Sequence, residues 1–348
     1  MPQAAEQFRV DQFLSEFAIS YGNLQSDYVA DRISPKVPVA QRSGKIRVWS
    51  KANDFRVDQN LAPRRSGDVS SRIDIKMDEQ PYSCERYARH VMVPMDDIDD
   101  LNGQLDLEME HTERLTSRML GLRELRLANS LKTAIVAAGN VIDLSTYNPS
   151  TDGLSTGATG AGNAQFDVAG SHPLILLTMV IKAVYAAIGV TVNQAVLPYD
   201  IALTLRNHPD YITRFQYWKD TIEDLELANR ILGMEPVVAR SQQNTAARGY
   251  EAETPNVAPM ESQDETLTLA PIWGNDIVLL YTPNPSVHRI GKSTLCTTKS
   301  LHVPGQSFVK KWFDNDHNST KVEQQDCITE QVTAPLTGFI IKNVLKVA

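Results

Sequence analysis

The sequence predicts a mixed α+β protein organised as two lobes around one long helix. Three stretches carry this prediction: alternating strands within residues 33–94, an uninterrupted helix over residues 105–138, and a run of strands and helices over residues 171–285. At 348 residues, the chain is long enough to bury a large core and to divide into two lobes. We therefore expect an α+β architecture in which the helix braces both lobes.

The helix over residues 105–138 is predicted by its periodicity. Apolar or small side chains recur every three or four residues from Leu105 to Ile135, which is the spacing of one helical face. At ~1.5 Å per residue the helix would be ~50 Å long, so we expect several parts of the protein to lie against it. A coiled coil fits less well, because no strict heptad repeat persists. The predicted core face of the helix includes Leu115, Met119, Leu122 and Leu125.

The bulk composition excludes several classes of protein. The formal net charge is −8, whereas a dedicated nucleic-acid binder would carry a basic face or domain. Cys84, Cys296 and Cys327 are scattered, which suits buried thiols in a reducing compartment better than a disulfide framework or a zinc site. The N-terminus lacks the basic start and apolar core of a signal peptide. The most apolar run, residues 173–190, carries Lys182 near its middle, so we expect a buried helix and no membrane span.

Residues 1–32 are predicted to form an N-terminal arm, and residues 33–94 an extended β-hairpin. The arm has too little apolar surface to be a domain, so we expect it to pack on its own body or on a neighbour. In the hairpin, apolar and charged side chains alternate along Lys45–Trp49 and Arg72–Asp78, the period of half-buried antiparallel strands. The long polar loop between them is either functional or disordered, and a merely solvated loop is the alternative to an interaction surface. The candidate assembly residues in this loop are Asp54, Phe55, Arg56, Asp58, Arg64, Arg65 and Asp68.

The helix region is assigned to residues 95–145, and the chain after it is predicted to form three further parts. Residues 146–170 are rich in Gly, Ser and Thr and are expected to be a flexible connector. Residues 171–285 predict a small α/β lobe whose first helix has Pro173 in its first turn. Residues 286–348 return to strand character and are expected to complete the lobe that contains the long helix.

The sequence contains no recognisable constellation for catalysis, a cofactor or a metal ion. The acidic turn around Gly103 fails as a calcium loop, because that register places Ile98 and Met109 at ligand positions. IGKS at 290–293 resembles the end of a phosphate loop, but the rest of the pattern is missing and a β-prone segment follows. We therefore predict no cofactor and no enzymatic activity, although a triad assembled from distant residues would leave no such pattern.

Several stretches, taken in their order and spacing, carry a family resemblance. They are YGNLQSDYVADRISPKVPVAQRSGKIRVW, HVMVPMDDIDDLNGQLDLEMEHTERLTSRMLGLRE, NAQFDVAGSHPLILLTMVIKAVYAAIGVTVNQAVLPYDIALTLRNHPDY, IWGNDIVLLYTPNPS and LTGFIIKNVLKV. Together they resemble the major capsid proteins of tailed bacteriophages, which have the Hong Kong 97-like fold. The resemblance spans nearly the whole chain, and none of the stretches is a short invariant motif.

The resemblance implies the parts of a shell subunit. These parts would be the N-terminal arm (1–32), the extended loop (33–94), the spine helix of a peripheral domain (95–145), a connector (146–170), an axial domain (171–285) and peripheral-domain strands (286–348). It implies self-assembly into hexamers and pentamers of an icosahedral head. The head would enclose double-stranded DNA without sequence-specific binding, and the protein would reside in the virion after passing through the host cytoplasm.

The resemblance also implies other partners. Because the chain starts almost directly at the arm, it implies a separate scaffolding protein, or none. A portal and, in some shells, a decoration protein are further partners. The covalent crosslinking of part of the family is not carried over, because no motif supports a particular Lys–Asn pair.

Two alternatives come from other classes of protein. An encapsulin-like compartment would share the fold and the self-assembly, but it would package protein instead of a genome. A cytoplasmic α/β enzyme would show turnover as a monomer or small oligomer.

Overall fold

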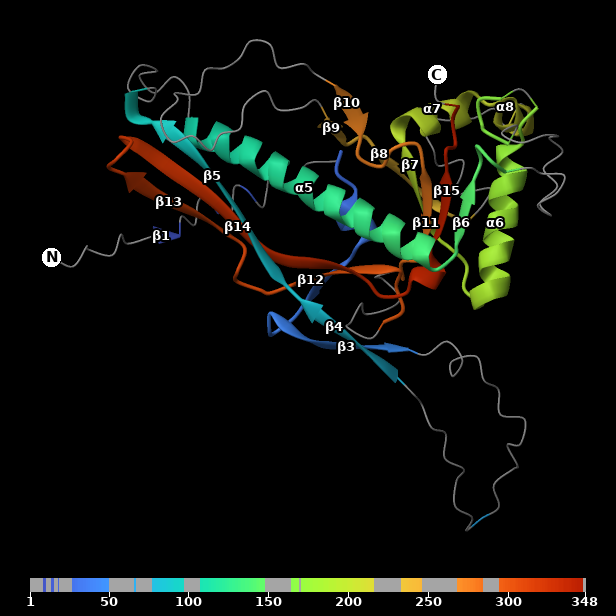
Figure 1. The fold of residues 1–348 in the computed structure, drawn as a ribbon, viewed down its shortest axis with the longest axis horizontal. Coiled ribbons are helices and arrows are strands. Elements are labelled where there is room, and N and C mark those ends of the chain that lie inside the picture. Colours follow the sequence, from blue (N-terminus) through green and yellow to red (C-terminus); the bar gives the residue numbers. More distant parts are fainter. Residues whose placement is uncertain are drawn as a thin grey trace.

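The structure is a computed structural model that describes residues 9–10, 14–15, 18, 27–49, 66, 77–96, 107–147, 164–168, 170–215, 233–245, 268–283 and 294–346. Two larger sheets lie toward the two ends of α5, the helix Leu107–Ala137, and a two-stranded ribbon projects from the body (Figure 1). The predicted α+β class is confirmed. Among the described helices, none combines the length and the apolarity that crossing a bilayer would require.

A six-stranded sheet lies along α5. Its strands are, in order, β1 (Arg9–Val10), β13 (Phe308–Asp314), β14 (Ser319–Val332), β12 (Thr298–His302) and β2 (Lys36–Pro38), with β5 (Glu85–Pro94) paired to the other edge of β14. The pairings are antiparallel except that of β2 with β12. Helix α5 packs along β14 and β5, so this sheet and the helix form one unit.

A five-stranded sheet forms the other lobe. Its order is β6 (Val141–Asp143), β15 (Phe339–Lys342), β11 (Ile277–Leu280), β7 (Gln194–Pro198) and β8 (Glu235–Ala239). On one face it packs against α6 (Pro173–Ile188), α7 (Tyr199–Asn207) and α8 (Pro209–Phe215), and on the other against α5 and the short helix α2 (Ala30–Ile33). Successive residues of β11 therefore enter different cores, and this burial on both faces explains an uninterrupted apolar strand.

The projecting ribbon consists of β3 (Ser43–Trp49) and β4 (Met77–Ser83), which pair antiparallel. The predicted alternation is confirmed along β3, where Ile46 is buried while Lys45 and Arg47 are exposed. A small core at its base, which includes Ile46 and Tyr82, joins the ribbon to β2, β12 and β14. The tip, residues 50–76 apart from Ser66, lies outside the described residues. A second ribbon pairs β9 (Gln242–Asn244) with β10 (Leu269–Pro271), and η1 (Pro335–Thr337) is a single 3-10 turn before β15.

The buried face of α5 differs from the predicted one in its middle turns. The predicted set is Leu115, Met119, Leu122 and Leu125. Of these only the first is buried, and the other three are half-buried. The middle turns instead bury Arg123, Glu124 and Leu127. Apolar periodicity could not reveal this face, because a buried Arg or Glu is stable only when distant residues supply partners for its charge.

Two strands lie in other sheets than predicted. Residues 85–94, assigned to the hairpin from sequence, form β5 at an edge of the six-stranded sheet, so the ribbon spans only residues 43–83. Strand β15, expected among the peripheral strands of residues 286–348, lies between β6 and β11 in the five-stranded sheet. Alternation predicts that a segment is a strand, but the partner is chosen by contacts distant in sequence.

Candidate functional site

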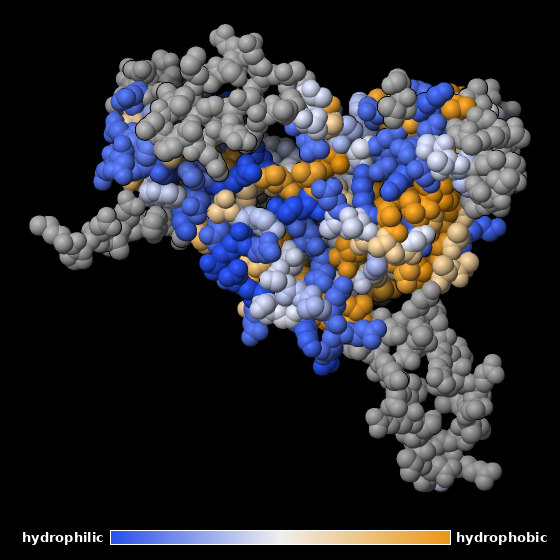
Figure 2. All heavy atoms as spheres, viewed as in Figure 1, coloured by the Kyte–Doolittle hydropathy of each residue, from blue (hydrophilic) through white to orange (hydrophobic). Residues whose placement is uncertain are grey.

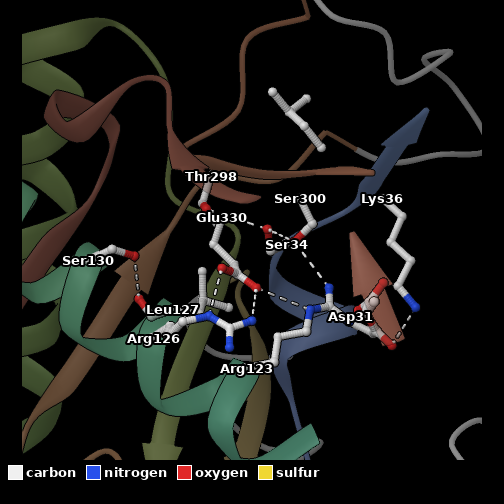
Figure 3. Close-up of polar contacts among 12 residues, drawn as sticks. Asp31, Ser34, Lys36, Arg123, Arg126, Leu127, Ser130, Thr298, Ser300 and Glu330 are labelled. Carbon is white, nitrogen blue, oxygen red and sulfur yellow. Dashed lines mark hydrogen bonds and ion pairs between the residues drawn. The ribbon is translucent and has the colours of Figure 1, made fainter. Parts of the chain in front are cut away.

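A buried ionic network joins the middle of α5 to the N-terminal segment and to β14 (Figure 3). Arg123, only 4% exposed, donates from Nη1 to Oδ1 of Asp31 at 2.5 Å and from Nη2 to Oγ of Ser300 at 3.1 Å. Its Nε lies 3.5 Å from Oε1 of Glu330. The Glu330 carboxylate also accepts two hydrogen bonds from Arg126, from Nη2 at 3.2 Å and from Nε at 3.4 Å. Three segments that are far apart in sequence are thus tied together.

The charges in this network are balanced by partners of opposite sign. Nζ of Lys36 lies 3.0 Å from the second carboxylate oxygen of Asp31. Burial alone would raise the pKa of Asp31, but Arg123 and Lys36 outweigh burial and hold that pKa below its usual value. Arg126 also stacks over the ring of Tyr87, 3.7 Å from its centroid, which links α5 to β5. We interpret the network as a structural junction, because each of its charged groups already has a partner of opposite sign within it.

The next residue of α5, Glu124, forms a second buried junction. Its carboxylate accepts hydrogen bonds from Nε1 of Trp273 at 2.7 Å, from Oγ of Ser241 at 2.5 Å and from the backbone N–H of Val29 at 2.8 Å. Burial raises the pKa of Glu124, although these hydrogen bonds act in the opposite direction. Arg123 and Glu124 together hold residues 29–31 at the centre of the molecule, from which the chain continues into β2 and the projecting ribbon.

A cleft of about 290 Å³ opens beside the first network. Its polar lining contains Lys36, Arg123 and His302 together with Asp31 and Asp326, and much of the remainder is apolar. Both signs of charge are present, so the cleft does not select an ion of either sign. In the part of the chain that the structure describes, no group of three or more ligating side chains could hold a metal ion.

Ser171, His208 and Asp210 resemble a nucleophile, a base and an orienting acid, but their hydrogen bonds do not suit that role. Nε2 of His208 lies 3.2 Å from Oγ of Ser171. Nδ1 of His208 accepts the backbone N–H of Asp210 at 3.1 Å. A backbone N–H can only donate, so the neutral imidazole must carry its proton on Nε2. His208 therefore donates to Ser171 and has no lone pair directed at it with which to remove its proton.

Apolar side chains are exposed where the end of α5, η1 and α6 pack together. Val136 is 36% exposed, Leu336 45% and Tyr185 56%, and Ile175 near the start of α6 is 38% exposed. Figure 2 shows apolar surface on this face over the five-stranded sheet and beside α6, whereas the surface over β12–β14 is mainly hydrophilic. Exposed apolar side chains gathered on one lobe are typical of surfaces that associate with another protein.

The candidate assembly residues Asp54, Phe55, Arg56, Asp58, Arg64, Arg65 and Asp68 lie outside the described residues. Sequence reasoning missed the junction of Asp31, Arg123 and Glu330. The sequence did contain one indication of it. Arg123 and Glu124 lie four and three residues before Leu127, so two adjacent charged residues stand on the helical face that continues with Leu127 and Leu131.

The chain was compared with family models, curated proteins and solved structures. No family model matches. The chain is 24% identical over 347 residues to a major capsid protein of Pseudomonas phage JBD67, with 97% of each chain covered. It is also 24% identical over 281 residues to a major capsid protein of Burkholderia phage BcepMu, which covers 79% of this chain and 76% of the relative.

Solved structures of other proteins share the fold of this chain. A phage-related protein from Bordetella bronchiseptica has a TM-score of 0.70 at 21% identity, with 99% of this chain and 100% of that chain covered. The capsid of the cyanophage P-SCSP1u has a TM-score of 0.53 at 11% identity, with 89% and 86% covered. The chain therefore has the fold of phage capsid subunits, the Hong Kong 97-like fold.

Proposed function

We infer that this chain is the major capsid protein of a bacteriophage and that it assembles with copies of itself into the virion shell. The observation that carries this conclusion is the likeness, over 97% of both chains, to a protein named as a phage major capsid protein. A protein of this kind is structural.

The parts of the subunit are proposed to have the following roles. The six-stranded sheet with α5 is the peripheral domain, with α5 as its spine helix, and the five-stranded sheet with α6–α8 is the axial domain. The ribbon of residues 43–83 is the extended loop. The buried junctions at Arg123 and Glu124 support this assignment, because they tie the segment that precedes β2 and strand β14 of the six-stranded sheet to one helix.

The ribbon and the exposed apolar side chains are the surfaces through which we propose that subunits contact one another. A subunit in a ring must present two different surfaces, one that contacts each neighbour, and every contact is repeated around the ring. We propose that the tip of the ribbon, with Asp54, Phe55, Arg56, Asp58, Arg64, Arg65 and Asp68, docks on an adjacent subunit. The exposed apolar side chains Val136, Tyr185 and Leu336 are proposed to be covered in the shell.

The finer proposal concerns the particle and its partners. The subunits would form hexamers and pentamers of an icosahedral head around double-stranded DNA, with no sequence-specific contacts. Assembly would take place in the host cytoplasm with a portal, with a separate scaffolding protein if one is required, and in some heads with a decoration protein. An encapsulin-like compartment is not favoured, because the curated relatives are proteins of phages.

The test is assembly of the full-length chain, alone and together with candidate scaffolding proteins. We expect light scattering to report large particles and negative-stain microscopy to show closed shells or rings of subunits. A strictly monodisperse monomer at all concentrations and salt conditions, with scaffold supplied, would contradict the proposal. Protein cargo in place of nucleic acid in particles from infected cells would favour the compartment alternative.

A further inference from the structure

A buried histidine joins two segments of the five-stranded lobe. His208, 7% exposed, lies between α7 and α8, and its Nδ1 accepts the N–H of Asp210 in the first turn of α8. Its Nε2–H donates to Oγ of Ser171, 3.2 Å away, and Ser171 in turn donates to the backbone oxygen of Phe166 at 3.4 Å. Phe166 is 1% exposed in the core between this sheet and α6. The chain of hydrogen bonds thus anchors the segment that leads into α6.

This chain of hydrogen bonds is complete only while His208 is neutral. A proton on Nδ1 would remove the acceptor for the Asp210 N–H, and it would place a positive charge on a ring that is 7% exposed. The Nε2–H donor to Ser171 would remain, so protonation acts by making the closed, buried position of the ring less favourable than the open one. We propose that His208 is an acid-sensitive latch that holds residues 164–172 against the α7–α8 junction and releases them on protonation.

The surrounding groups set the direction of the effect. Burial lowers the pKa of His208, Asp210 on α8 opposes this by favouring the proton, and His172 at the start of α6 adds to the lowering. The Asp210 carboxylate is itself paired with His172, whose Nδ1 lies 3.1 Å from Oδ2, whereas His208 contacts the backbone N–H of Asp210. The folded pKa therefore lies below that of an exposed histidine, about 6.5.

The sign of the pH dependence follows from this shift. The open segment, in which His208 is exposed, takes up a proton at a higher pH than the closed one. The latch is therefore at full strength above about pH 6.5 and weakens as the pH falls below that value. From pH 7.5 to pH 5.5, the equilibrium constant for opening can rise by at most about tenfold, the ratio set by a histidine that titrates only when open.

Hydrogen exchange read by mass spectrometry tests the latch in the purified full-length protein. After correction for the intrinsic effect of pH, peptides covering residues 164–172 and 208–215 should exchange up to about tenfold faster at pH 5.5 than at pH 7.5. A peptide from β14 should not change. His208→Asn is the key variant, because its Oδ1 can still accept the Asp210 N–H but cannot titrate in this range. We expect its exchange to be independent of pH.

Two results would overturn the latch. One is exchange of residues 164–172 in the wild-type protein that does not change with pH; the other is the same acid-induced increase in His208→Asn. If His208→Asn does not fold, Ser171→Ala provides the test, because it leaves the imidazole in place and removes both links made by the Ser171 hydroxyl, to Nε2 of His208 and to the backbone oxygen of Phe166. In that variant, residues 164–172 should exchange faster than in the wild-type protein already at pH 7.5, and their exchange should respond less to acid. If the variant exchanges at the wild-type rate at pH 7.5, the latch is contradicted. His90→Asn, at an exposed histidine of β5 away from this junction, is the matched control and should keep the pH dependence.

Discussion

At the scale of single residues, Gly338 shows how closely α5 is packed against the five-stranded lobe. A Cβ atom at this position would lie 2.6 Å from Cδ1 of Ile135 and 3.1 Å from Cγ2 of Thr297. Ile135 has no exposed surface, so its side chain cannot move into solvent. The cause is steric, because the φ angle of −104° at Gly338 is accessible to any residue.

Gly338→Ala should therefore lower the free energy of unfolding by about 1–3 kcal/mol, the usual cost of overpacking. Urea unfolding would measure it. Ile135→Val removes the clashing methyl group, so the double variant should recover part of the loss. Gly121→Ala is the matched control: its new Cβ would lie 3.5 Å from the Tyr28 ring, an ordinary contact, and the helix would gain up to about 1 kcal/mol. Equal destabilisation by the two alanines would argue against the steric explanation.

At the scale of elements, the buried face of α5 contains Leu127, whereas Leu122 lies at its edge. Leu127 is fully buried in the core shared with α2 and the five-stranded sheet, whereas Leu122 is half-buried. Leu127→Asp places an unpaired charge in an apolar core and should cost several kcal/mol, giving an unfolded or insoluble subunit by circular dichroism. Leu122→Asp should remain folded with a smaller loss. The reverse order would show that the sequence-derived face was the correct one.

The junction at Glu330 gives a second test at this scale. Glu330→Ala leaves the buried Arg123 and the half-buried Arg126 without their shared carboxylate. Because Arg123 keeps Asp31 as a partner, we expect a cost at the lower end of the about 3–5 kcal/mol that breaking a buried pair usually costs. Glu79→Ala is the control, because the Lys45–Glu79 pair of the ribbon is exposed and solvent screens such pairs, so we expect little change in stability. Chemical unfolding of both variants measures the difference, and similar small effects would mean that the junction does not stabilise the fold.

The same elements show what a sequence can predict. Helix α6 and strands β3, β7, β8 and β11 were predictable because their local period or apolar run matches their structure. The buried face of α5 was not, because Arg123 and Glu124 are stabilised by Asp31, Glu330 and Trp273, up to about two hundred residues away. The prediction of which sheets contain β5 and β15 was wrong for the same reason. Periodicity is local, whereas pairing and charge compensation depend on the whole chain.

At the scale of the whole molecule, the subunit combines a rigid centre with a projecting ribbon. The cores on both faces of the five-stranded sheet and the two junctions on α5 make the body one unit. The described part of the ribbon joins the body at its base. There Ile46 and Tyr82 pack with residues of β2, β12 and β14, and Gln80 donates a hydrogen bond to the backbone oxygen of Val332. This separation suggests that the ribbon beyond its base serves the assembly more than the fold.

Trimming the ribbon separates these two roles. Replacing residues 53–71 by a short Gly-containing turn leaves the described β3–β4 pairs intact, up to Trp49 opposite Met77. Loop-closure entropy depends only weakly on length, so the melting temperature should stay within a few degrees of the parent. Assembly should fail, because in a symmetric shell the loss of one contact is repeated at every subunit. We expect circular dichroism to show a folded subunit, and negative-stain microscopy to show no closed shells.

A second variant tests whether the charges or the length of the tip are needed for assembly. It keeps the length of the tip but replaces its charged residues, from Asp54 to Asp68, by serine. If the charges dock on a neighbour, this variant should fail to assemble like the trimmed one, because serine cannot replace an ion pair across an interface. If it assembles while the trimmed chain does not, length and the apolar residues Phe55, Val57, Leu61 and Val69 make the contact.

Normal shells from the trimmed chain would rule out the ribbon as the assembly arm, and a collapse of its melting temperature would instead place the tip in the core of the subunit.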